Sequence, residues 1–208
     1  MKEPGWAQKI PMPGPLRWLA PPARWEAPDR SVLTIAAGPG TDWFVDPRGE
    51  GEPIVSAPAL VADPIGDYVL TARVTAELAE TFDAGSLVLY ADERTWAKLC
   101  LERSPQGEAM VVSVVTRGVS DDCNSFTLAA HVVWLRIARR GPAFAFHAST
   151  EGRFWRLVRH FALEAPAADR KGPAVGFEAQ SPMGDGCAAT FEDIRFAAEH
   201  LGDLRDGS

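Results

Sequence analysis

The side chains best suited to chemistry occupy alternate positions of one short segment, residues 95–103 (TWAKLCLER). Trp96, Lys98 and Glu102 alternate there with apolar residues. Because side chains of a β-strand point alternately to the two faces of its sheet, these three share one face. An aromatic ring can cover the apolar side of a sugar while charged groups hydrogen-bond its hydroxyls in a partly desolvated groove. The segment therefore indicates a face that binds a polyhydroxylated ligand.

Neighbouring segments extend this polar face by the same alternation. Residues 110–118 (MVVSVVTRG) are ambiguous, because valines occupy both sets of alternate positions. Placing Val112 and Val114 in the core puts Ser113 and Arg117 on the polar face. The candidate ligand-binding residues are then Tyr90, Trp96, Lys98, Glu102, Ser113, Arg117, Ser120, Asp121, His147, Glu178 and Gln180. The solvated side of an ordinary antiparallel sheet has the same alternation, so the pattern alone leaves both interpretations open.

A second interpretation is glycoside hydrolysis, which needs two carboxyl groups ~5–5.5 Å apart for retention or ~6.5–9.5 Å apart for inversion of configuration. The catalytic candidates are Glu102 paired with either Glu178 or Asp121. However, the E-x-D-x-x-E pattern that places both carboxyl groups on one strand is absent, and so is a G-x-S-x-G nucleophile elbow. The sequence therefore favours a protein without catalytic activity.

No residue spacing indicates a metal or a cofactor. The four histidines are too far apart in the sequence for a zinc site. Residues 63–67 (DPIGD) and 120–122 (SDD) offer carboxylates for calcium, but turn-forming aspartates account for both. Residues 184–189 (GDGCAA) mimic a dinucleotide-binding G-x-G-x-x-A, yet they lead into a strand-like segment rather than a helix. We expect no metal and no cofactor.

The elements that must position these side chains are short strands. Residues 84–156 contain four successive alternating segments separated by turn signals, and similar segments precede and follow them. About eleven to thirteen strands at a spacing of 8–12 residues are typical of sandwiches and jelly rolls. The sequence therefore predicts an all-β fold, a two-sheet antiparallel β-sandwich (jelly roll). We expect an extended lead-in over residues 1–14, a single sandwich domain over 15–198 and a frayed or helical tail over 199–208.

Composition limits the partners and the compartment. The 208 residues carry a net charge of −7, so the basic surface needed for nucleic acid or an anionic membrane is missing. No apolar run approaches the ~18 residues of a membrane helix, and prolines near the N-terminus interrupt any secretory signal. The three cysteines are widely spaced, which favours reduced thiols. We expect a cytoplasmic protein, and its Ala, Arg and Pro bias indicates a bacterial source.

Several motifs together resemble one family. They are WL-PP-W (residues 18–25), TDWF (41–44), AGSLVLYADERTWAKLCLE (84–102), SVVTRGVSD (113–121), WLRIARRGPAFAFHASTEGRFWRLVR (134–159) and VGFEAQSPMGDG (175–186). In this order they resemble the domain-of-unknown-function 1349 family, also called regulation-of-enolase-protein-1-like, over roughly residues 15–200. The resemblance implies a sandwich of the concanavalin A-like lectin/glucanase type. Two departures are visible: Asp122 follows the Ser-Asp pair where relatives tend to have tryptophan, and His147 stands where tyrosine is commoner.

Three functions remain open from the sequence. The first is a non-catalytic module that binds a carbohydrate or small metabolite, including a sugar phosphate, since Lys98 and Arg117 suit a phosphate or uronate. The second is the sugar-active hydrolase. The third, implied by the family name, is a module that binds a protein partner and regulates a metabolic enzyme. On the first interpretation Trp96 and Glu102 lie outside the core, so their replacement by alanine is expected to cost little stability, whereas Leu99→Ala is expected to cost about 2–5 kcal/mol.

Overall fold

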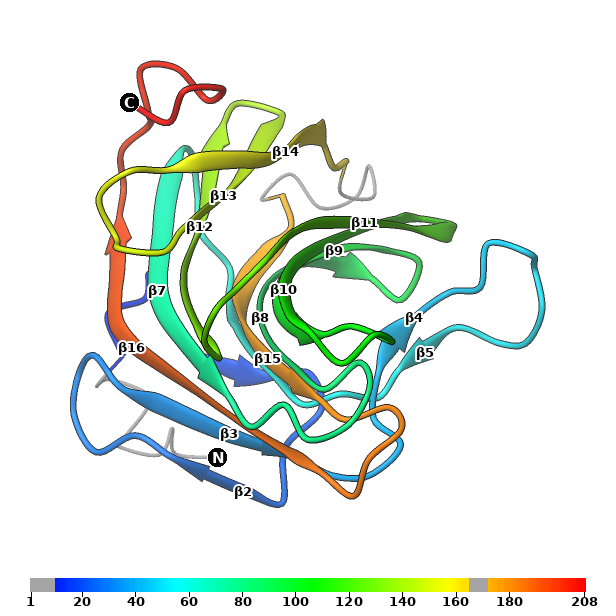
Figure 1. The fold of residues 1–208 in the computed structure, drawn as a ribbon. Helices are drawn as coiled ribbons and strands as arrows, with labels where there is room; N and C mark the ends of the chain where they lie inside the picture. Colours follow the sequence, from blue (N-terminus) through cyan, green and yellow to red (C-terminus); the bar gives the residue numbers. More distant parts are fainter. Residues whose placement is uncertain (1–9, 165–171) are drawn as a thin grey trace.

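The computed structural model describes residues 10–164 and 172–208, where the regular structure consists of strands and no helix is found. Two seven-stranded antiparallel sheets pack face to face, as Figure 1 shows. The predicted two-sheet sandwich is therefore confirmed. Residues 1–9 of the predicted lead-in, and most of a predicted polar loop at 164–172, lie outside the described residues. Within the described ranges no helix is long and apolar enough to cross a membrane.

The first sheet contains the strand in which Trp96, Lys98 and Glu102 alternate. Its strands, in spatial order, are β1 (Arg17–Trp18), β6 (Ala59–Ala62), β15 (Ala174–Gln180), β8 (Ala84–Asp92), β9 (Thr95–Arg103), β10 (Ala109–Arg117) and β11 (Val119–Thr127). From β8 to β11 the strands follow one another through tight turns, as the alternating sequence predicts. β15 comes from much later in the chain and lies between β6 and β8.

The second sheet backs the first. Its strands, in spatial order, are β14 (Arg156–Ala162), β13 (Ala143–Ser149), β12 (Val132–Arg140), β7 (Tyr68–Ala76), β16 (Cys187–Ala197), β3 (Leu33–Ala37) and β2 (Arg24–Glu26). A separate short pair, β4 (Trp43–Phe44) and β5 (Ile54–Val55), lies beside the first sheet on the side away from the second (Figure 1). Sixteen strands are thus present in the described residues, more than expected from the sequence, because several span only two or three residues.

The main core lies between the two sheets. On β7, Tyr68, Leu70, Ala72 and Val74 face this core, as their alternation predicts. Phe177 of β15 packs against Phe191 of β16, with ring centroids 5.1 Å apart, and so joins the two sheets. Burying one such aromatic side chain contributes roughly 1.5–3 kcal/mol. Alternation alone thus fixes the inward face of most strands.

The C-terminal segment, residues 199–208, forms turns rather than a helix. Leu204 is buried in a small apolar cluster on the outer face of the second sheet. The backbone oxygen of Leu204 lies 2.9 Å from Nε2 of His147. This segment therefore packs on the sandwich instead of fraying from it.

Candidate functional site

We call the side of the first sheet that is turned away from the second sheet the groove face. The strand register confirms that Trp96, Lys98 and Glu102 share this face, because they pair through β8 with Tyr90, Val88 and Ala84. Glu178 and Gln180 of β15 join the same face, since they lie opposite Ser86 and Ala84. Their inward neighbours Leu87, Leu89, Ala97, Leu99 and Leu101 belong to the main core, as predicted.

Much of the groove face is a second apolar core rather than a solvated surface. Trp96 is 0% exposed, and its ring meets Trp43 of β4 edge-on, with centroids 5.6 Å apart. Tyr90 also packs against Trp43, at 5.5 Å. The expectation that Trp96 lies outside any core is therefore wrong. The cause is the β4–β5 pair, which covers this part of the sheet and which strand alternation cannot reveal.

The uncovered part of the groove face contains a cavity of about 250 Å³, which we call the groove. Of the predicted residues, Lys98, Glu102 and Gln180 line it. The other lining residues are Asp42, Phe44, Phe82, Ser104, Pro105, Val112, Val114, Asp122 and Asn124. The groove thus combines two aromatic rings with carboxylate, amide and ammonium groups, the mixture typical of small-molecule sites.

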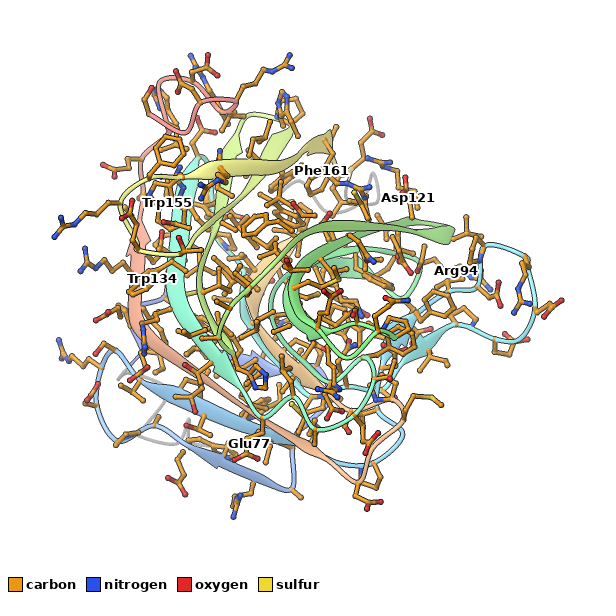
Figure 2. The ribbon with its side chains drawn as sticks, in the orientation of Figure 1. Glu77, Arg94, Asp121, Trp134, Trp155 and Phe161 are labelled. Carbon is orange, nitrogen blue, oxygen red and sulfur yellow. The ribbon has the colours of Figure 1, made fainter. Side chains whose placement is uncertain are left out.

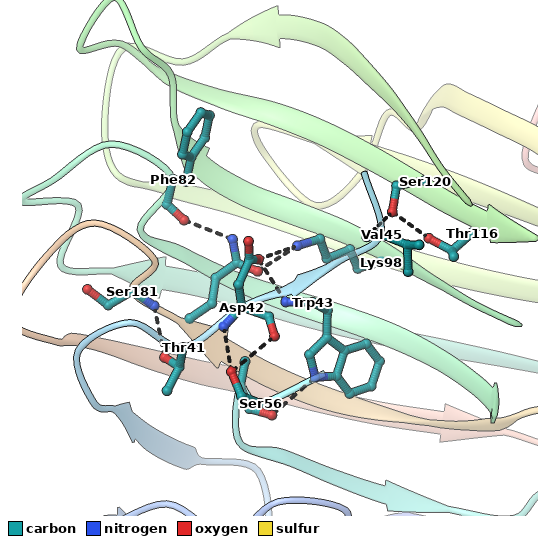
Figure 3. Close-up of polar contacts among 12 residues, drawn as sticks. Thr41, Asp42, Trp43, Val45, Ser56, Phe82, Lys98, Thr116, Ser120 and Ser181 are labelled. Atoms are coloured by element: carbon teal, nitrogen blue, oxygen red, sulfur yellow. Dashed lines mark hydrogen bonds and ion pairs between the residues drawn. The ribbon is translucent and has the colours of Figure 1, made fainter. Parts of the chain in front are cut away.

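Lys98 is the central polar group of the groove (Figure 3). Its Nζ donates to Oε1 of Gln180 at 2.6 Å and pairs with Oδ1 of Asp42 at 3.3 Å. Gln180 in turn donates from Nε2 to the backbone oxygen of Phe82 at 2.9 Å. Burial works against the charge on Lys98, but Asp42 and the neighbouring acids outweigh it and raise the pKa of Lys98. Lys98 is therefore charged and already bound to two partners, Gln180 and Asp42.

The carboxyl groups near Lys98 are held in a poorly solvated environment. Burial raises the pKa of Glu102 to about 8, although Lys98 acts in the opposite direction. Burial likewise raises the pKa of Glu178 to about 7 and also raises the pKa of Asp122. Both carboxyl oxygens of Glu178 are buried without a hydrogen-bond partner. Because an unpaired buried carboxylate is costly, Glu102 and Glu178 exist largely as neutral acids below these pKa values.

Three predicted residues lie on the opposite face of the first sheet. Ser113 pairs with Leu99, and Asp121 pairs with Val115, so both point away from the groove. Arg117 shares their face and donates to the backbone oxygen of Ala162 at 2.7 Å. Their assignment to the polar face is therefore wrong. The physical reason is that β10 is buried on both sides: Val112 and Val114 belong to the second apolar core, not to the main one.

Ser120 and His147 have structural contacts instead of places in the groove. Ser120 accepts a hydrogen bond from the backbone N–H of Val45 at 2.9 Å and bonds Thr116 at 2.9 Å, which fastens the β4 segment to the sheet (Figure 3). His147 is in β13 of the second sheet, so it is not part of the groove. Its predicted place beside Trp96 and Lys98 is wrong, because sequence alternation does not say to which sheet a strand belongs.

The groove also contains residues that the sequence analysis did not select. Asp122 and Asn124 lie opposite Val114 and Val112 of β10, in the same rows as Lys98 and Cys100. Strand alternation from Ser120 would have pointed to both. Asp42 and Phe44 come from the TDWF segment, whose approach to the groove face depends on long-range packing and has no local signal.

The fold defines the class of protein as an all-β, two-sheet jelly-roll β-sandwich. The chain belongs to the family described as Protein of unknown function (DUF1349), whose model matches residues 18–199. No curated protein matches the sequence.

Several solved structures have a fold similar to that of this chain. A functionally unknown protein from Saccharomyces cerevisiae is similar over 90% of this chain and 97% of its own, with 24% identity and a TM-score of 0.80. The GH43 protein BlXynB from Bacillus licheniformis is similar over 88% of this chain, with 18% identity and a TM-score of 0.65. A bifunctional GH43-CE protein from Bacteroides eggerthii is similar over 91% of this chain, with 14% identity and a TM-score of 0.69. The chain spans only 37% and 24% of these two larger proteins.

Proposed function

We propose that the protein is a non-catalytic, carbohydrate-binding β-sandwich whose groove holds a neutral polyhydroxylated molecule. The observation that carries this proposal is the composition of the groove, in which Phe44 and Phe82 stand beside a dense set of hydrogen-bonding side chains. Aromatic rings suit the apolar side of a sugar ring, while carboxylate and amide groups accept and donate to its hydroxyls.

Electrostatics favour a neutral ligand over a sugar phosphate. Lys98 is already bound to Asp42 and Gln180, and Arg117, the second cation suggested for a phosphate, lies on the opposite face. Asp122 adds a further acidic group to the lining. A groove in which acids outnumber cations repels anions, so its spare hydrogen-bonding capacity suits hydroxyl groups.

Positions of the carboxyl groups favour binding over hydrolysis. Asp121 is on the far face in an ion pair with Arg159 at 3.1 Å, and the carboxyl oxygens of Glu178 are fully buried. Of the predicted catalytic candidates only Glu102 lines the groove. The other carboxylates of the lining are Asp42, which is paired with Lys98, and Asp122 of β11. Neither of the predicted partners of Glu102 for hydrolysis is therefore among them.

One observation still supports glycoside hydrolysis as a second candidate function. Burial holds the pKa of Glu102 at about 8, so this carboxyl group is protonated at neutral pH, as a general acid must be. In that case Asp122 would be the second carboxylate. Release of a reducing sugar from a disaccharide would distinguish this function from simple binding.

The test is titration calorimetry of the protein with xylose, xylobiose, glucose and glucose 6-phosphate. The xylose compounds are included because a similar sandwich occurs in a xylan β-1,4-xylosidase from Bacillus halodurans. We expect a neutral sugar to bind and the phosphate to bind more weakly. At a concentration of about 100 times its dissociation constant, such a sugar should also stabilise the fold by ~2.7 kcal/mol.

Asp122→Asn and Asp121→Asn form a matched pair for this test, because neighbouring residues of β11 face opposite sides. Removing the charge-assisted hydrogen bond of Asp122 should weaken sugar binding about tenfold, whereas Asp121→Asn should leave it unchanged. Equal losses in both variants, or binding of glucose 6-phosphate alone, would contradict the proposal.

A further inference from the structure

The outer face of the second sheet carries a row of polar side chains that runs across four strands. Arg195 of β16 lies opposite Thr71 of β7, which lies opposite Arg136 of β12, which lies opposite His147 of β13. Thr71 and Arg136 are on the side away from the main core, because their chain neighbours Leu70, Ala72, Leu135 and Ile137 form that core. Two guanidinium groups thus flank one threonine on the face opposite to the groove.

Arg136 is a buried cation without a carboxylate partner. It is only 6% exposed, and among residues 10–164 and 172–208 no carboxylate forms an ion pair with it. Its Nη2 donates to the backbone oxygen of Gly207 at 2.9 Å, while its Nε is buried without any partner. Burial lowers the pKa of Arg136 to about 10, yet it remains charged at neutral pH. Buried charges in proteins are normally paired, so this guanidinium is missing its anion.

A cavity of about 260 Å³ opens beside Arg136, and we call it the outer pocket. Trp134 and Trp155 line it, and Figure 2 shows both on the outer side of the second sheet. The guanidinium of Arg136 lies over the ring of Trp155, 4.2 Å from its centroid. Only glycine at position 152 leaves space for the Trp134 ring, because a Cβ there would lie 3.0 Å from ring atoms. Aromatic walls with a few precisely placed polar groups are typical of small-molecule pockets.

The rim of the outer pocket is charged and exposed. The exposed residues that line the rim are Arg195, Asp193 and Glu199. The formal charges of the rim and of Arg136 cancel, so the pocket does not attract anions by net charge. Its preference must come from the buried position of Arg136, where the low polarity of the surroundings strengthens a direct ion pair.

We propose that the outer pocket binds an organic carboxylate, whose carboxylate group pairs with Arg136 and Arg195 and whose ring lies against the indoles of Trp134 and Trp155. An arginine fork matches the two oxygens of a carboxylate, which gives paired and directional hydrogen bonds. A ring of the size of a sugar or a benzene fits a pocket of this volume. The site is separate from the groove, because it lies on the outer face of the other sheet.

The competing explanation is a water molecule that joins the two unsatisfied nitrogens Nε of Arg136 and Nδ1 of His147, both of which are buried without a partner. A bridging water would satisfy these two atoms. It would leave the charge of Arg136 unbalanced. On that explanation the protein would show no preference for a charged ligand, and this difference is what the experiment measures.

The experiment is calorimetric titration of the full chain with D-glucuronate, D-glucose, benzoate and inorganic phosphate. Glucuronate and glucose share the ring and differ in the carboxylate, so the pair isolates the charge. We expect glucuronate or benzoate to bind at least about tenfold more tightly than glucose, the effect of one charge-assisted hydrogen bond. No binding of either carboxylate, glucuronate binding that only equals glucose binding and is unchanged in Arg195→Gln, or binding of phosphate alone would overturn the proposal.

Variants locate the binding. Arg195→Gln and Trp155→Leu change the exposed rim and one wall, and each should weaken carboxylate binding about tenfold. Arg30→Gln removes another exposed arginine far along the chain and is the matched control, with no expected change. Asp122→Asn separates this site from the groove, since carboxylate binding should survive it. Loss in Asp122→Asn with full binding in Arg195→Gln would place the carboxylate in the groove and overturn the proposal.

Discussion

Nζ of Lys98 lies 2.6 Å from Oε1 of Gln180, although β8 separates the two strands that carry these residues. The same ammonium group is 3.3 Å from Oδ1 of Asp42, which comes from the segment that precedes β4. Lys98 therefore connects three parts of the chain that are distant in sequence. Its ammonium group pairs with Asp42 and links β9, β15 and the segment before β4 at the groove.

The first prediction concerns this connection. Lys98→Met keeps the length of the side chain but leaves Gln180 and Asp42 without their donor. Removing one partner of a buried ion pair typically costs several kcal/mol, and we expect a loss of about 3 kcal/mol in the free energy of unfolding, measured by urea denaturation. Arg17→Met is the control, because its pair with Asp63 is about half exposed and should contribute less than about 1 kcal/mol. Similar losses in both variants would contradict the central role of Lys98.

The second prediction concerns Trp96, which belongs to the second apolar core. Trp96→Ala should lower the free energy of unfolding by about 3–5 kcal/mol, as much as truncation of a large residue in any core. Phe154→Ala removes a ring that is 62% exposed and should cost less than about 1 kcal/mol. Thermal and urea unfolding of the two variants measure the difference. A Trp96→Ala protein as stable as the parent would show that β4 does not cover this face in solution.

The third prediction is a decrease of stability between pH 6.5 and 8. In the folded protein the pKa values of Glu178 and Glu102 are raised to about 7 and 8, from 4.5. In this window the folded state therefore binds more protons than the unfolded state, so the free energy of unfolding falls as pH rises. We expect a decrease of about 1–2 kcal/mol.

Urea unfolding at several pH values checks this decrease. Below pH 6.5, His147 acts in the opposite direction, since burial lowers its pKa to about 4 and its neutral form is favoured as pH rises. The window above pH 6.5 avoids this overlap. Glu178→Gln has no ionisable group at the buried position and should have a shallower decrease. An unchanged slope in that variant would argue against a neutral Glu178.

The fourth prediction concerns the contact between β15 and β6. A Cβ added at Gly176 would lie 2.0 Å from the backbone oxygen of Leu60, so even alanine must push the two strands apart. We expect Gly176→Ala to cost several kcal/mol or to prevent folding. Gly38→Ala is the control, because a Cβ there meets no atom within 4 Å. It should change the free energy of unfolding by less than about 0.5 kcal/mol. Circular dichroism during thermal unfolding compares the two.

Strand alternation predicted the fold and one face of β9 correctly, because the charged residues Lys98 and Glu102 alternate with apolar residues even though both sides of this strand are buried. The same rule failed on β10, where Val111 and Val115 face the main core while Val112 and Val114 face the second one. A strand with apolar residues on both faces has no polar and apolar alternation from which to assign them. The misplacement of Ser113 and Arg117 follows from this single ambiguity.

The rest of the candidate site depended on contacts between distant segments. Asp42 reaches Lys98 only because the chain returns across the first sheet after β3, and His147 is excluded only because β13 joins the second sheet. Neither fact has a local signal in the sequence. Lys98, Glu102 and Gln180 could be predicted because each of them lies on a regular strand of the sheet that forms the groove.

The place of β15 between β6 and β8 has a consequence for the order in which the protein folds. When a ribosome has produced β6 and β8, their facing edges still lack the strand that joins them, since β15 begins only at Ala174. Pairings between residues this far apart in sequence form slowly. Until they form, both edges expose backbone groups that can pair with other chains. The nascent protein is therefore open to aggregation through these two edges until β15 has been synthesised and has paired with them.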